Sequence, residues 1–263
     1  KIAKIMLPKD YLVYRLSGAF STDLSDASGM LLLDVKNRRW SREMCDVCGI
    51  SEQMLPELHE SYEVVGMLKK EIADKFGLKD VKIIAGAGDN AAAAVGTGVV
   101  GEGGCNISLG TSGTLFVSSA SYKEDKVNAL HSFCHADGGW HLMGCILSAA
   151  SCNSWWVNGI LQSTDYKKEE DGLDEVIGQN DVYFLPYLMG ERSPHNDVTA
   201  RGAFIGMRPD TTRKIMTLAM LEGVTFALRD CLEAAKKNGA VIPRTKLCGG
   251  GAKSKLWRKI VAN

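Results

Sequence analysis

The stretch from Gly86 to Gly113 most constrains how this chain can fold, because glycines there separate short segments typical of strands and helices. An apolar segment with β-branched residues at three of its five positions, Val81 to Ala85, precedes the first glycines, and an alanine run follows the acid Asp89. This order predicts a strand, a glycine corner and then a helix. Glycines at 86 and 88 let the backbone turn sharply and let a ligand approach it. We expect Asp89 to be the N-cap of the helix.

Asp89 has two interpretations at this point. It is either a cap and nothing more, or a functional carboxylate displayed on a corner. An isolated Asp in such a place is more often only a cap. A choice between the two therefore depends on features elsewhere in the chain.

The second half of the stretch predicts a β-hairpin. Cys105 to Leu109 and Thr114 to Ser118 each alternate as strands do, and the small-residue turn Gly110-Thr111-Ser112-Gly113 lies between them. Such a turn exposes consecutive backbone N–H groups, and its two hydroxyls add donors. Together these donors can surround a phosphate without a basic side chain. Most Gly-Thr-Ser-Gly turns are only turns, so a second feature is needed.

That second feature lies near the end of the sequence, at Cys248-Gly249-Gly250-Gly251-Ala252-Lys253-Ser254. Thr245 to Cys248 predicts a strand, and Ser254 to Val261 predicts a helix. A strand, a glycine run and a helix start form a platform for a nucleotide. The loop is not a P-loop, because the G-x-x-x-x-G-K-[ST] spacing is absent.

The sequence resembles the FGGY family of carbohydrate kinases along essentially its whole length. The resemblance is carried by LPKDYLVYRLSG, STDLSDASGMLLLDV, AGAGDNAAAAVGTG, ISLGTSG, HSFCHADGGWHLM, LSAASCNSWW, FLPYLMGERSPHN, ARGAFIGM with LAMLEG, and CGGGAKSKLWR. One departure is Ile215, where the family usually has a polar residue. The family's N-terminal D-x-G-T phosphate hairpin has no counterpart, so we expect an internal fragment that is at best a binding fragment by itself.

The resemblance implies an α/β fold of the actin-like, ribonuclease H-like ATPase type, with two domains. Residues 1–98 would be the C-terminal part of a first, sugar-binding domain, and 99–263 a second, nucleotide-binding domain truncated at its end. Asp89 would be the catalytic base, and Asp89 and Asn90 would bind the sugar. The nucleotide would be bound by Gly110, Thr111, Ser112, Gly113, Gly249, Gly250, Gly251, Ala252 and Ser254.

The implied reaction is transfer of a phosphoryl group from ATP, which arrives with Mg²⁺, to D-xylulose. No protein side chain is assigned as a metal ligand. Gluconate, ribulose and glycerol are alternative sugars of the same family. A non-catalytic actin-like module that binds nucleotide is an alternative of a different class.

The amino-acid composition limits the classes of binding partner that we expect. Thirty-one basic and thirty-one acidic residues cancel, so no field of one sign would attract nucleic acid or an anionic membrane. No apolar run approaches the roughly 20 residues that span a bilayer. Eight cysteines, mostly in apolar segments, are typical of reduced thiols in a cytoplasmic protein. The sequence leaves a homodimer open.

Several side chains invite a functional interpretation that we weigh against a structural one. Cys45-x-x-Cys48 has the spacing of a redox or zinc motif, but no second cysteine pair at metal-binding spacing accompanies it, so we do not expect such a site there. We expect His131 and His135 to belong to a packed strand and not to a metal site. Trp155 and Trp156 are expected in the core. We predict that Ser163 to Asp181 is a solvated excursion, and that the loop with Glu191 and Arg192 lies at a surface or cleft.

Overall fold

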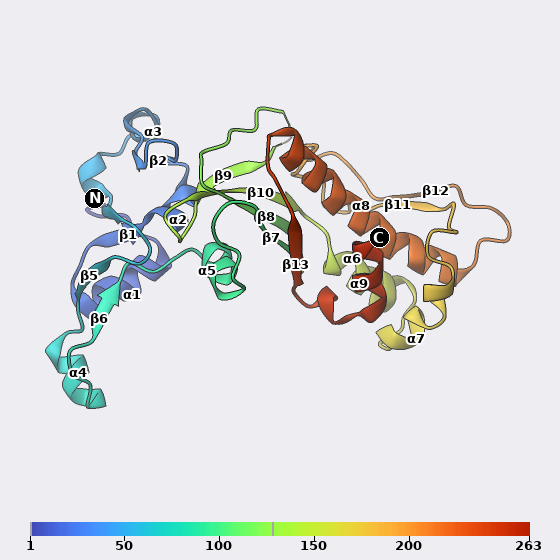
Figure 1. Ribbon diagram of the computed structural model, residues 1–263, viewed down its shortest axis with the longest axis horizontal. Coiled ribbons are helices and arrows are strands. Elements are labelled where there is room, and N and C mark those ends of the chain that lie inside the picture. Colours follow the sequence, from blue (N-terminus) through green and yellow to red (C-terminus); the bar gives the residue numbers. More distant parts are fainter. Residues whose placement is uncertain (1, 128) are drawn as a thin grey trace. The chain divides into compact units, whose positions relative to one another are not determined.

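The computed structural model describes residues 2–127 and 129–263, and the chain divides into two compact units (Figure 1). The first unit comprises the chain up to Glu102 with Ser118–Lys123 and Ser132–His141. The second comprises Gly103–Val117, Glu124–His131 and Leu142–Asn263. The division between domains at residue 98 stays a prediction.

Within the first unit, the strands pair in twos. Strand β1 (Ser21–Asp23) is parallel to β4 (Glu57–His59), whereas β2 (Leu33–Asp34) with β3 (Arg39–Trp40) and β5 (Val64–Met67) with β6 (Lys82–Ile84) are antiparallel. The helices are α1 (Pro8–Ser17), α2 (Leu24–Ala27), α3 (Arg42–Val47), α4 (Lys70–Phe76) and α5 (Asp89–Gly96), with 3₁₀ turns at Ser28–Met30 and Glu52–Met54.

Local sequence chemistry sets the ends of these helices. Pro8 stands in the first turn of α1, and Gly18 closes that helix with a left-handed φ of 88°. Ser41 caps α3 by accepting from the N–H of Met44. A small core of apolar side chains holds the unit together, among them Leu33, Trp40 and Leu55.

The second unit is built on a mixed sheet. The strand order is β13-β7-β8-β10-β9, and the division between the units falls within β8, β9 and β10. These strands are β7 (Gly104–Leu109), β8 (Gly113–Ser119), β9 (His131–Cys134), β10 (Trp140–Ile146) and β13 (Arg244–Cys248). Strand β7 is antiparallel to β8 and parallel to β13. The mixed sheet with covering helices agrees with the predicted α/β class.

Helices and a second pair of strands complete this unit. They are α6 (Ala150–Ser154), α7 (Tyr166–Glu170), α8 (Arg213–Lys237) and α9 (Lys255–Ala262), a π-helical segment at Trp155–Ile160, 3₁₀ turns at Leu173–Glu175 and Gly251–Lys253, and the antiparallel pair β11 (Tyr183–Leu185) and β12 (Ala203–Ile205). The long helix α8 packs beside β11 (Figure 1). It begins at the N-cap Thr212.

The core of the second unit lies between the sheet and α8. Leu109, Leu115 and Ile146 from the strands are fully buried, as are Leu218 and Leu221 from the helix. Trp156 is buried in the same core and Trp155 packs against it, which confirms their expected place. This core supports the ends of β7 and β13, where the predicted nucleotide motifs lie.

Candidate functional site

The predicted hairpin turn is present. Leu109 on β7 pairs with Gly113 on β8, so Gly110, Thr111 and Ser112 form the loop between the strands. A Cβ on Gly113 would lie 2.7 Å from the side chain of Ile146. Glycine is therefore required at 113 by close packing below the turn.

The carbonyl groups of the turn are directed toward the start of α6. The N–H of Ala150 donates to the carbonyl of Gly110 (2.8 Å), and the N–H of Ala149 donates to that of Thr111 (3.0 Å). The Ser112 hydroxyl donates to the carbonyl of Leu147 (3.2 Å). Within the described part of the chain, the N–H groups of Thr111 and Ser112 have no protein acceptor. They are free to donate to an anion.

The glycine loop after β13 lies directly against this turn. Cys248 pairs with Ser108 on the parallel strand β7, so the two strands end side by side. Gly249 has a φ of +88°, and a Cβ there would lie 2.6 Å from the carbonyl carbon of Leu109. The two motifs, far apart in sequence, thus meet at one edge of the sheet, and only glycine fits at their junction.

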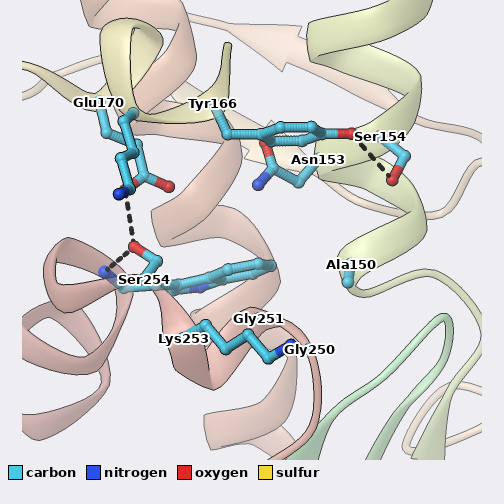
Figure 2. Close-up of a pocket in the computed structure, with 11 residues that line it drawn as sticks. Ala150, Asn153, Ser154, Tyr166, Glu170, Gly250, Gly251, Lys253 and Ser254 are labelled. Atoms are coloured by element: carbon cyan, nitrogen blue, oxygen red, sulfur yellow. Dashed lines mark hydrogen bonds between the residues drawn. The ribbon is translucent and has the colours of Figure 1, made fainter. Parts of the chain in front are cut away.

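A pocket of about 410 Å³ opens beside this junction (Figure 2). Tyr166 and Asn153 lie across it from Gly250 and Gly251. The residues that line it are Ala150, Asn153, Ser154, Tyr166, Lys167, Glu170, Gly250, Gly251, Lys253, Ser254 and Trp257. Of the predicted loop residues, Gly249 and Ala252 are not among those lining the pocket. Ala150 connects the pocket to the turn through its bond to Gly110.

The prediction of a solvated excursion at Ser163 to Asp181 is wrong in part. Its α7 supplies Tyr166, Lys167 and Glu170 to the pocket. The charged composition hid this role, because polar side chains that line a pocket and polar side chains in solvent look alike in sequence. The cap signal of Asp165, which accepts from the N–H of Lys168 (3.1 Å), could have indicated the helix.

Ser254 joins the two walls of the pocket. Its hydroxyl accepts from the N–H of Trp257 (3.0 Å) as the N-cap of α9, and donates to Oε2 of Glu170 (2.7 Å). Burial raises the pKa of Glu170, and the hydrogen bond from Ser254 opposes that rise. A carboxylate, a hydroxyl, an aromatic ring and glycine backbone therefore converge on one pocket.

Asp89 lies in the first unit, on the predicted strand-to-helix corner between β6 and α5. It is exposed. The N-cap is Gly88, not Asp89 as predicted, because Asp89 already has helical geometry and the carbonyl of Gly88 accepts from Ala92 (2.9 Å). The carboxylate Oδ1 accepts instead from the N–H (2.7 Å) and the side-chain amide (3.1 Å) of Asn90. It is thus held in place at the surface.

The two glycines of this corner serve different needs. Gly86 has a φ of +86°, which is unfavourable for other residues. Gly88 has an ordinary φ of −59°. A Cβ on Gly88 would lie 3.3 Å from the Cα of Asp26, so close packing accounts for that glycine.

The remaining candidates from the sequence are the cysteines of the Cys45-x-x-Cys48 motif and the histidines near β9. Cys45 is buried and Cys48 is exposed, both as free thiols. His135 Nε2 lies 2.9 Å from the carbonyl of Val99. In residues 2–127 and 129–263, no group of three or more His, Cys, Asp or Glu side chains is arranged to hold a metal ion.

The loop lies at a surface as predicted, with Arg192, His195 and Asn196 exposed, but Glu191 within it is buried. This side chain is only 2% exposed, and its Oε1 accepts from the N–H groups of Leu147 (2.9 Å) and Arg192 (2.7 Å). Burial raises the pKa of Glu191 against the effect of these two bonds. The polar sequence of the loop concealed that one carboxylate turns inward to satisfy main-chain donors.

Among the described residues, no helix is both long enough and apolar enough to span a bilayer.

Comparison with known proteins places this geometry in a family. Residues 1–96 match the N-terminal domain, and residues 105–263 the C-terminal domain, of the FGGY family of carbohydrate kinases. The chain is 41% identical to the xylulose kinase of Escherichia coli K12 and 40% identical to that of Klebsiella pneumoniae, in each case over 100% of this chain and 54% of the relative. It spans about half the length of these curated relatives.

Solved structures agree with the sequence comparison. A xyloylose kinase from Brucella ovis superposes with a TM-score of 0.92 at 42% identity, over 99% of this chain and 54% of that one. A gluconate kinase from Lactobacillus acidophilus superposes with a TM-score of 0.88 at 28% identity, with the same coverage. The actin-like ATPase fold predicted from the sequence is thereby confirmed. The chain belongs to the FGGY family of carbohydrate kinases.

Proposed function

We propose that the full-length protein transfers the γ-phosphoryl group of ATP to D-xylulose and yields D-xylulose 5-phosphate. The observation that carries the nucleotide half of this proposal is the junction of two motifs, the Gly110–Ser112 turn and the Gly249–Gly251 loop, beside one pocket. The sugar is assigned from the whole-chain similarity to relatives named xylulose kinase.

In this proposal the phosphates of the nucleotide contact the turn, and its adenosine end occupies the pocket. The unbonded N–H groups of Thr111 and Ser112 hold phosphate oxygens, since main-chain donors suit an anion without a basic side chain. The adenosine end enters the pocket between Tyr166 and Gly250, where a ring can lie against an aromatic face and the open side of a glycine. Glu170 and Ser254 offer polar groups for its hydroxyls.

Magnesium fits this arrangement as a companion of the nucleotide. The turn offers main-chain N–H donors to a phosphate, whereas Mg²⁺ prefers phosphate oxygens, carboxylates and waters. Phosphate oxygens and waters would therefore supply its coordination, and no protein side chain is proposed as a ligand. When bound, the ion neutralises charge on the transferred phosphoryl group.

Asp89 is the proposed base for the acceptor hydroxyl of the sugar. Its carboxylate is exposed, and the amide groups of Asn90 hold one of its oxygens. The other oxygen can accept the hydroxyl proton as the bond to phosphorus forms. A carboxylate is a weak base for an alcohol, so orientation contributes at least as much as basicity.

The test replaces Asp89 by Asn in the full-length protein. We expect turnover of D-xylulose to fall by roughly a hundredfold or more, the usual scale for a positioned base, with the affinity for sugar largely kept. Asp46→Asn is the matched control, because Asp46 is an exposed carboxylate on a helix of the same unit. Normal turnover by the Asp89→Asn variant would disprove the assignment.

A second sugar is a specific alternative. The gluconate kinase from Lactobacillus acidophilus superposes as well as the xylulose kinase from the same organism, with TM-scores of 0.88 and 0.85 at 28% and 27% identity. ATP consumption should therefore be measured with D-xylulose, ribulose, gluconate and glycerol. Highest kcat/KM for gluconate would reassign the substrate, and nucleotide binding without turnover of any sugar would favour a non-catalytic module.

A homodimer and a cytoplasmic location stay predictions from the sequence. Light scattering on the full-length protein would test the first, and imaging of a tagged protein in cells the second.

A further inference from the structure

We propose that Lys9, Asp23 and Ser25 form a largely buried network that sets the position of the corner carrying Asp89, and that Ser25 is a positioning residue for phosphoryl transfer. This inference rests on the proposed role of Asp89 as the base. All the residues concerned belong to the first unit.

The corner consists of the four residues between β6 and α5, and side chains of the network hold its two ends. The ammonium group of Lys9 donates to the carbonyl of Ala85 (3.0 Å). The N–H of Gly88 donates to the hydroxyl of Ser25 (3.0 Å). The first bond fixes the position of the chain directly after β6, and the second fixes the position of the N-cap of α5.

Main-chain bonds hold the first half of the corner. The N–H of Ala85 donates to the carbonyl of Glu63 (3.0 Å), and the N–H of Gly86 donates to that of Ser61 (3.0 Å). Toward the helix, the N–H of Gly88 is bonded to Ser25 and to no main-chain carbonyl in the described residues. Ser25 is therefore the attachment of the corner nearest to Asp89.

Asp23 orients the Ser25 hydroxyl. The Asp23 side chain is fully buried, and its Oδ2 accepts from the hydroxyls of Ser25 (2.5 Å) and Ser61 (2.8 Å). Because the hydroxyl hydrogen of Ser25 is directed to Asp23, the lone pairs of its oxygen are available to the N–H of Gly88. Asp23 thus makes Ser25 an acceptor at the corner.

Lys9 completes the network and balances its charge. Its Nζ lies 3.0 Å from Oδ1 of Asp23 and 2.8 Å from Oδ1 of Asp10, whose side chain is also buried. Burial alone would lower the pKa of Lys9, but the hydrogen bond to Asp10 and the charge of Asp23 raise it above its usual value. The Lys9 stem also fills the space beside Gly86, with its Cδ 3.2 Å from where a Cβ would be.

One peptide unit separates the residue that the network holds, Gly88, from the proposed base, Asp89. Gly88 is the N-cap of α5 and Asp89 is the first helical residue. Release of the Gly88 N–H lets the helix start shift, and the Asp89 carboxylate moves with it. A misplacement of about 1 Å at a reacting group can cost about a hundredfold in rate. Ser25 therefore influences turnover without touching a substrate.

The experiment compares Ser25→Ala with Ser28→Ala in the full-length protein. Ser28 is buried in the next turn, donates to the carbonyl of Leu24 (2.7 Å) and accepts from the N–H of Cys134 (3.0 Å), so it shares burial but not the corner. We expect Ser25→Ala to speed amide hydrogen exchange at residues 86–90 by about fivefold and to lower kcat about tenfold. Ser28→Ala should change neither.

Both substitutions are then repeated with Asp89→Asn. If Ser25 acts through Asp89, Ser25→Ala should lower kcat by less than about twofold in that background. An equal loss of kcat in both backgrounds would show a merely structural role and overturn the proposal. Ser25→Thr, which keeps the hydroxyl, should restore kcat to within about threefold of the parent.

The exchange measurement separates this proposal from the proposed function. If the parent protein phosphorylates none of the sugars, the proposed function fails, but faster exchange at 86–90 in Ser25→Ala still supports control of the corner by the network. Unchanged exchange at these residues would overturn the network whatever the reaction.

Discussion

Two neighbouring glycines in one loop allow effects on protein stability and on ligand binding to be tested separately. Gly249 has a left-handed φ, and a Cβ there would lie 2.6 Å from the carbonyl carbon and oxygen of Leu109. Gly250 has an ordinary helical conformation, with φ −62° and ψ −40°, and a Cβ there would meet nothing within 4 Å. Gly250 lines the pocket, whereas Gly249 does not. We predict that Gly249→Ala damages the fold and Gly250→Ala damages nucleotide binding.

The magnitude for Gly249→Ala has two parts. A non-glycine residue in the left-handed region costs about 1–2 kcal/mol. Forcing a methyl group against backbone that cannot give way costs about 1–3 kcal/mol more. The free energy of unfolding should therefore fall by about 2–5 kcal/mol, and Tm by roughly 4–20 °C at about 2–4 °C for each kcal/mol. Gly250→Ala should change the free energy of unfolding by less than about 0.5 kcal/mol.

The assay is thermal unfolding of both variants, followed by calorimetric titration with MgADP. A methyl group in the pocket displaces the ligand from the glycine face, so we expect Gly250→Ala to weaken binding about tenfold, which corresponds to about 1.4 kcal/mol. Equal stability of Gly249→Ala and the parent would refute the packing argument. Unchanged MgADP affinity in Gly250→Ala would refute the assignment of the pocket.

Two further substitutions test the pocket and the first unit. Ser254→Ala removes the N-cap of α9 and the donor to Glu170, so we expect denaturant titration to show a loss of about 1–2 kcal/mol; a loss below about 0.3 kcal/mol would contradict the role of Ser254. Burial, with a smaller effect of nearby His135, lowers the pKa of His141 well below its usual value. Only the unfolded chain then takes up this proton, so stability present at neutral pH is lost as pH falls below about 6.5, by up to about 1.4 kcal/mol per pH unit. His141→Phe should reduce this loss by about 1 kcal/mol between pH 7.5 and 5.5 in urea unfolding, and an unchanged loss would show that His141 does not cause it.

Features decided by near neighbours in the chain could be predicted from the sequence. The strand, glycine corner and helix around Asp89 follow from glycines between a strand-like segment and a helix-like one. The hairpin at Gly110 to Ser112 follows from small turn residues between two alternating segments. One cap was misplaced, because Gly88 and Asp89 can each begin such a helix and their sequence does not distinguish them.

The sequence by itself thus determined the fold class, the family and the positions of the glycine turns, since turns need residues that tolerate unusual backbone geometry. Tertiary structure alone decided which distant residues share a site. Tyr166 and Glu170 reach the pocket from a segment of ordinary polar composition, Glu191 turns inward, and Ser25 meets Gly88 across the first unit. The physical reason is that burial and hydrogen-bond satisfaction depend on what the folded chain brings together, and no local pattern records those partners.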